Sequence, residues 1–130
     1  MNIRMLRLFV VCAALLVGAA VPSGQTSATR TVMRDKLELS HHVLDAVMTG
    51  NFAALERDAT ALTRVTERPG WLVLTTPEYA HYSSAFVSAT QELAAAAKAH
   101  DLDAAAARYA SMTMACYQCH RYVARSRQSF

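Results

Sequence analysis

The pattern of apolar positions along the chain predicts helices and no strands. From about residue 31 onward, apolar residues recur every three or four positions, the spacing of one helix face, without the alternation typical of a β-strand. Four such stretches are separated by Gly50-Asn51, by Pro69-Gly70 and by the polar residues around Asp101, which are typical of helix ends and turns. The sequence therefore predicts an all-α domain of four helices.

We expect these helices at residues 31–49, at 52–66, from 77 onward after Thr76 as N-cap, and from 101 or 103 to about 125. Their inward-facing positions are predicted to be Met33, Leu37, Leu44 and Met48; Phe52, Leu55, Ala59 and Leu62; Tyr79, Tyr82, Phe86, Ala89 and Leu93; and Ala105, Tyr109, Met112, Cys116, Cys119 and Val123. Helices of this length with short connections favour an antiparallel four-helix bundle.

The antiparallel order predicts which residues lie at the same level. The end of the fourth helix should lie level with the start of the first, so that His120 faces the region of Met33 and Leu37. The connection after the second helix and the start of the third reach the same level, which places Trp71 and Tyr79 there as well. The adjacent His41 and His42 lie roughly 12–14 Å farther along the first helix and are poor partners for His120.

The first segment has a composition of its own and is predicted to be a secretory signal peptide. Arg4 and Arg7 precede an apolar run from Leu8 to Ala20, followed by small residues and a proline. The run is short for a membrane span, and an uncleaved anchor is the alternative. We expect residues 1–28 to be signal peptide and flexible polar arm, cleaved after Ala20 or Ala28, and residues 29–130 to form the domain in the periplasm.

Removing this leader changes the charge of the chain. Of its thirteen Lys and Arg, Arg4 and Arg7 lie in the leader, so the remaining eleven nearly balance ten Asp and Glu. A near-neutral domain gives no electrostatic reason to expect nucleic-acid binding. Neither a pair of carboxylates nor a Ser or Cys nucleophile is arranged for catalysis, so the sequence predicts a protein that is not an enzyme.

The candidate chemistry lies near the C-terminus, in Cys116-Tyr117-Gln118-Cys119-His120. Two cysteines three positions apart, followed at once by a histidine, form the covalent haem-attachment pattern of c-type cytochromes. On a helix the three functional side chains share one face. Cys116 and Cys119 would form thioethers to one haem c, and His120 would be the proximal ligand of its iron.

Other interpretations of this motif fit less well. A thioredoxin-like dithiol lies at the start of a helix that follows a strand, whereas this motif falls late in a helical stretch. Structural zinc takes four ligands, and no second cysteine pair is present, because the third cysteine, Cys12, lies in the leader. A helical protein without haem, in which the two thiols form a local disulfide, is a further alternative.

The attachment motif at the end of the last of four helices resembles the class II cytochromes c, the cytochrome c′ family. The resemblance covers residues 31–125 and is most specific at Cys116, Cys119 and His120. It implies a periplasmic mono-haem cytochrome that carries single electrons between periplasmic redox proteins. It also implies a contact between the first two helices of each chain in a homodimer.

The resemblance further implies that the first helix contributes the distal side of the haem. Met33 would donate a sixth iron ligand, or Leu37 would block an open site at which small gases such as nitric oxide or carbon monoxide bind. Gas binding is therefore the alternative function. Trp71 and Tyr79 are candidates for the haem pocket. Many members carry an arginine four residues after the haem histidine, where this chain has Ala124 between Arg121 and Arg125.

Overall fold

The computed structural model describes residues 23–128, which form four helices and no strands. The helices are α2 (Ser23–Thr49), α3 (Phe52–Val65), α4 (Pro77–Lys98) and α5 (Leu102–Gln128). The prediction of an all-α domain with four helices is confirmed for these residues. The predicted signal peptide falls mostly on residues 1–22, outside the described residues. Within the described part, no helix combines the length and apolar character that crossing a membrane requires.

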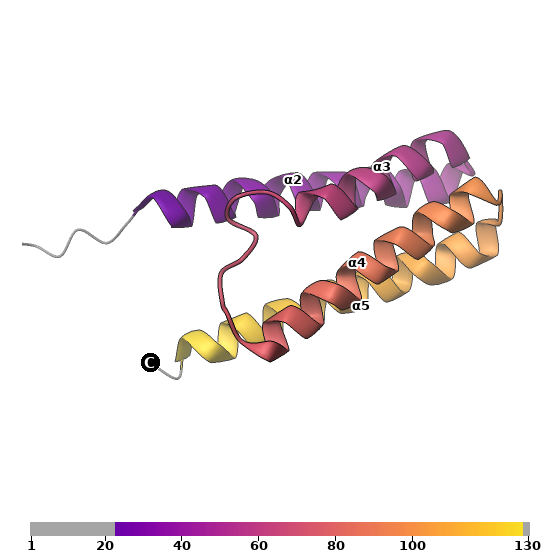
Figure 1. The fold of residues 1–130 in the computed structure, drawn as a ribbon. Coiled ribbons are helices and arrows are strands. Elements are labelled where there is room, and N and C mark those ends of the chain that lie inside the picture. The colour runs from indigo at the N-terminus through magenta and orange to yellow at the C-terminus, as the bar shows by residue number, and fades with distance from the viewer. Residues whose placement is uncertain (1–22, 129–130) are drawn as a thin grey trace, which may run out of the picture.

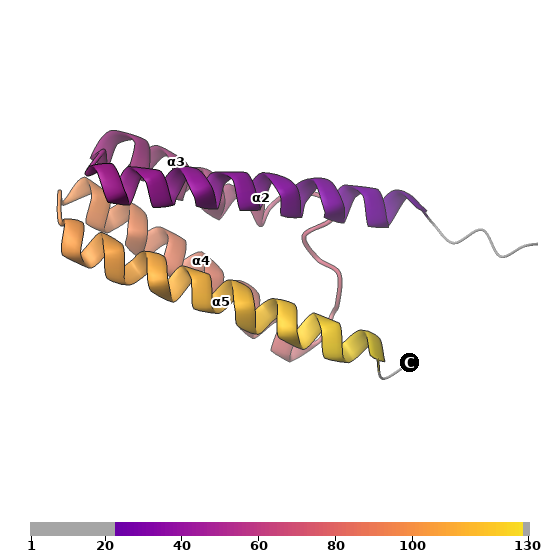
Figure 2. The same cartoon turned by 180° about the vertical axis from the view of Figure 1, so that it is seen from behind.

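The helices form two hairpins that lie close together at one end and diverge toward the other. Figure 1 shows α2 and α3 side by side above α4 and α5, with both short turns at the same end. The connection of residues 66–76 passes between the hairpins at the opposite end. Seen from behind, α2 and α5 separate progressively toward that end (Figure 2). We call the two ends the turn end and the open end.

The two turns at the turn end have the same backbone pattern. After α2, the amides of Gly50 and Asn51 donate to the carbonyls of Val47 and Ala46 at 3.3 and 2.9 Å. After α4, the amides of His100 and Asp101 donate to Ala97 and Ala96, both at 3.0 Å. This is the Schellman arrangement, in which the residue after the helix is left-handed. Gly50 and His100 take that conformation, with φ of +64° and +56°.

Each turn also begins the next helix with a side-chain cap. The Asn51 side-chain oxygen accepts from the Ala54 amide at 3.1 Å, and the Asp101 carboxylate accepts from the Ala104 amide at 2.9 Å. Thr76 does the same for α4, where its hydroxyl accepts from Tyr79. The predicted cap at Thr76 is confirmed, and α3 ends at Val65, one residue before its predicted end.

The first helix departs from the prediction in two ways. It begins at Ser23 rather than at residue 31, so residues 25–28, expected to belong to a flexible arm, are helical. Its buried face is also different, because Leu37, Leu44 and Met48 are exposed. The positions that point inward are Val32, Lys36, Val43, Ala46 and Val47. The face predicted to be inward is therefore wrong for α2, although Met33 does pack partly against the core.

The cause of the error on α2 is that two neighbouring stripes both carry apolar residues. The stripe chosen from the sequence avoids Lys36, whereas the buried stripe includes it. The exposed Leu37, Leu44 and Met48 lie on a helix that the family resemblance places at a subunit contact. The homodimer stays a prediction.

The core is formed mainly by large apolar side chains from α3, α4 and α5. Leu55 and Leu62 from α3, Phe86 and Leu93 from α4, and Met112 from α5 are at most 1% exposed. Burying a side chain of this size contributes about 1.5–3 kcal/mol. The predicted inward positions on these three helices are thus mostly correct.

Candidate functional site

The haem-attachment motif lies in the second half of α5, on the side of the helix that faces the other hairpin. Cys116 and Cys119 are free and half-buried, while Tyr117 and Gln118 between them line a groove on the other side with His81 and Met114. The residues of the motif therefore lie on two sides of α5. Its two thiols face the interior, and its two intervening residues face outward, as the three-residue spacing requires.

Aromatic side chains from the connection and from α4 lie opposite the thiols. Trp71 is 6% exposed, Tyr79 3% and Phe86 1%. The rings of Trp71 and Phe86 have centroids 5.4 Å apart. The indole Nε1 of Trp71 donates to Ser83 Oγ at 2.8 Å, and the Tyr79 hydroxyl donates to the Trp71 carbonyl. These hydrogen bonds fix Trp71 between α4 and the connection.

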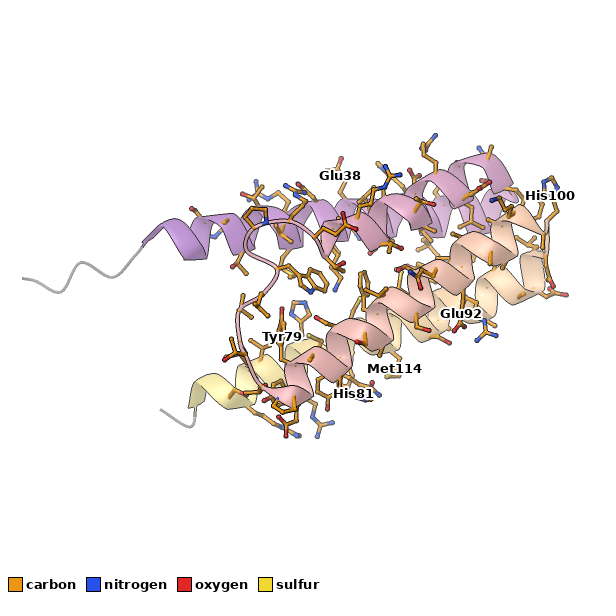
Figure 3. The ribbon with its side chains drawn as sticks, in the orientation of Figure 1. Glu38, Tyr79, His81, Glu92, His100 and Met114 are labelled. Carbon is orange, nitrogen blue, oxygen red and sulfur yellow. The ribbon has the colours of Figure 1, made fainter. Side chains whose placement is uncertain are left out.

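Figure 3 shows Tyr79 on the side of α4 that faces the gap between the hairpins, while His81 points away from it. Burial, together with the nearby Cys119 thiol, raises the pKa of Tyr79. The phenol therefore stays protonated near neutral pH and remains a hydrogen-bond donor. Of the predicted pocket residues, Trp71 and Tyr79 are brought next to the motif.

The connection of residues 66–76 crosses the open end and contacts both α2 and α5. Gly70, with φ of +93°, lies against the backbone of α2, where an added Cβ would come within 2.7 Å of Ala28 C and Thr29 N. An ion pair joins Arg68 to Asp35 on the same helix. Thr76 Oγ1 and the Tyr122 hydroxyl on α5 are 2.7 Å apart. The connection therefore covers part of the site and is held to α2 on one side and to α5 on the other.

The ionisable groups of the motif respond to this partial enclosure. Burial raises the pKa of the Cys119 thiol, and the neighbouring Lys36 opposes this by lowering it. Burial, and then Lys36, lower the pKa of His120, which keeps part of its surface in solvent. His120 is therefore neutral at pH 7, the form in which imidazole binds a metal.

These properties distinguish between the possible uses of the two thiols. A reactive dithiol has a thiolate stabilised at a helix N-terminus, whereas Cys119 lies far along α5 and has a raised pKa. Among the described residues, no group of three or more His, Cys, Asp or Glu lies close enough to hold a metal ion. The four-ligand set of structural zinc is therefore not assembled there.

A haem fits the residues that are present. Both thiols are on one helix face and are unpaired, the imidazole follows them on that face, and buried aromatic side chains provide apolar walls. Met33 lies on α2, partly buried and packed against the core. Leu37 is 57% exposed and does not join this group. The haem-binding roles of Met33, Leu37, Trp71 and Tyr79 stay predictions.

Sequence reasoning missed one member of the site. Lys36 is 6% exposed, and its ammonium group lies over the rings of Phe86 and Trp71, 4.1 and 5.0 Å from their centroids. The available signal was spacing, because Lys36 falls four residues after Val32 and seven before Val43, in phase with the buried stripe. Long charged side chains are rarely buried, so this spacing by itself does not predict a buried lysine.

Comparison with known proteins gives no family for this chain. No protein-family model, curated protein or solved structure matches it.

Proposed function

We propose that this protein is an exported, mono-haem c-type cytochrome whose antiparallel four-helix bundle carries single electrons between periplasmic redox partners. The observation that supports this most strongly is the position of the two free thiols and the adjacent imidazole, on one face of α5 toward buried aromatic rings. Haem c would supply a one-electron ferrous–ferric couple, and it would need no catalytic residue from the chain.

The residues of the site would have distinct tasks in such a cytochrome. Cys116 and Cys119 would hold haem through thioethers, and His120, neutral at pH 7, would bind the iron on the side of α5. Met33 is the proposed sixth ligand. Trp71, held by Ser83 and Tyr79, would limit the access of water from the open end. A rigid surround suits electron transfer, because little has to rearrange when the charge of the iron changes.

The first experiment tests covalent attachment. The full chain is expressed in a host competent in cytochrome maturation, and the purified protein is stained for haem under denaturing conditions and weighed by mass spectrometry. We expect stain and a mass greater than the polypeptide by one haem, since thioethers survive denaturation. The Cys116→Ser/Cys119→Ser variant should lose both, while Cys12→Ser should keep both. Colourless wild-type protein with the bare polypeptide mass would refute the proposal.

The second experiment separates electron transfer from gas binding. With Met33 on the iron, the ferric protein should show a weak band near ~695 nm, and carbon monoxide should change the reduced spectrum little. Met33→Ala should lose the band and bind carbon monoxide readily, whereas Met48→Ala, on the exposed face of the same helix, should behave as wild type. Rapid carbon monoxide binding by wild type would favour the gas-binding alternative.

A further inference from the structure

Lys36 is a charged side chain that is buried in the interior of the bundle. It projects inward from α2 and is 6% exposed, yet no carboxylate among the described residues forms an ion pair with it. Long charged side chains are rarely buried without a partner, because removing the ammonium group from water costs free energy. A lysine that serves packing alone would be replaced more favourably by leucine or methionine.

The ammonium group is held in place by aromatic faces. Its Nζ lies 4.1 Å from the centroid of Phe86 and 5.0 Å from that of Trp71, distances at which the ring electrons attract a cation. Both rings are themselves fixed, Phe86 by the core and Trp71 by its hydrogen bond to Ser83. The charge therefore has a defined position and is not free to swing into solvent.

That position faces the attachment motif. The two rings that hold the ammonium group, those of Trp71 and Phe86, belong to the buried cluster against which Cys116 of the motif packs. Lys36 comes from α2, on the opposite side of the gap from His120. It lies one helical turn from Met33, the proposed sixth ligand.

We propose that Lys36 is a fixed cation of the haem site that raises the reduction potential of the bound iron. The inference rests on the proposed function and goes beyond it by assigning a residue that sets the potential. Oxidation adds one positive charge to the iron, and a cation held nearby disfavours that charge. The interaction is strong because the group is buried, where the effective dielectric is low and salt screens little.

The experiment measures the midpoint potential of the purified holoprotein by optical redox titration. Lys36→Met removes the charge while keeping an unbranched side chain, and we expect it to favour the ferric form about tenfold, a fall of about 59 mV for a one-electron couple. Lys36→Arg keeps a charge that cannot bind iron and should stay close to wild type. The matched control is Lys98→Met, which removes the same charge from an exposed site near the turn end.

A second measurement uses the apoprotein, made as the Cys116→Ser/Cys119→Ser variant. Adding Lys36→Met should change the emission of Trp71, the sole tryptophan, because the ammonium group lies over its ring. The far-ultraviolet circular dichroism and the urea midpoint should not fall. A clear fall in the urea midpoint would show that Lys36 has a structural role, which would overturn its assignment as a functional cation.

The remaining outcomes also decide the question. A haem-loaded Lys36→Met protein with the wild-type potential would overturn the inference and leave the proposed function intact. If Lys36→Arg shifts the potential as much as Lys36→Met and both change the ferric spectrum, Lys36 is an iron ligand and not an electrostatic group. A wild-type protein without haem stain would remove the proposed function itself, and this is known before any potential is measured.

Discussion

At the turn end of the bundle, the chain reverses twice in turns with one hydrogen-bond pattern, and the helices beyond them are packed by apolar side chains. At the open end the helices diverge, and they are joined through the connection of residues 66–76, a buried lysine and a layer of aromatic rings (Figures 1 and 2). The comparison teaches that the two turns and the candidate site lie at opposite ends of the same four helices, on one continuous core. Substitutions at the two ends should therefore have separable effects.

The largest effect is expected from a substitution in the core near the turn end. Leu93 on α4 is fully buried, and Leu93→Ala should lower the free energy of unfolding by about 2–5 kcal/mol, through lost apolar contact and the cavity left behind. Urea unfolding followed by circular dichroism measures this. The optical spectrum of the folded protein should not change. The exposed Leu72→Ala is the control. A loss below about 1 kcal/mol would show that this half is not tightly packed.

A smaller loss in the free energy of unfolding is expected at Gly70, which lies beside the candidate site. An alanine there would place its Cβ against the backbone of Ala28 and Thr29 and would strain a φ of +93°, so the connection must move away from α2. We expect Gly70→Ala to cost roughly 1–3 kcal/mol. The emission of Trp71, the next residue, should shift to longer wavelength as water enters. Pro69→Ala, at an exposed neighbour, is the control. Unchanged emission would mean that the connection does not enclose the site.

The smallest effects should come from the two turns. Gly50→Ala meets no atom within 4 Å, so its cost is that of a left-handed alanine alone, about 1–2 kcal/mol. His100→Gly relieves the same conformation but removes a ring stacked on Phe52, with centroids 4.7 Å apart, so the net change in the free energy of unfolding should be close to zero. Thermal unfolding of both variants measures the difference. Equal effects would contradict the view that the two turns are equivalent in backbone and different in side-chain support.

Much of the fold could be predicted from local signals. Gly50, the Thr76–Pro77 pair and Asp101 each satisfy a helix end through neighbouring backbone groups, so their role is fixed by a few adjacent residues. The start of α2 at Ser23 was not predicted, because no cap or apolar periodicity marks it in this polar stretch. Gly70, by contrast, was expected as a chain break, and the structure adds its contact with α2.

The candidate site was predicted in part, and the missing part depends on long-range contacts. The motif residues of α5 share a face by helix geometry alone, and the bundle order was enough to place Trp71 and Tyr79 beside them. Which stripe of α2 faces inward depends on what it meets. Val32 and Val43 meet the core, and Lys36 meets two aromatic rings contributed by distant segments. The residues next to Lys36 in the sequence do not indicate that these rings lie nearby, so its burial was not predicted.

The contacts of the connection suggest where the separation of the two hairpins can change during evolution. Gly70 sets its distance from α2, Thr76 meets Tyr122 on α5, and Trp71 is anchored on α4, so a few residues of irregular chain act as a spacer between the two hairpins. Mutations in this spacer could widen or narrow the separation of α2 from α5 without disturbing the core. Among related sequences, changes in the spacing between α2 and α5 should therefore arise first from substitutions in residues 66–76.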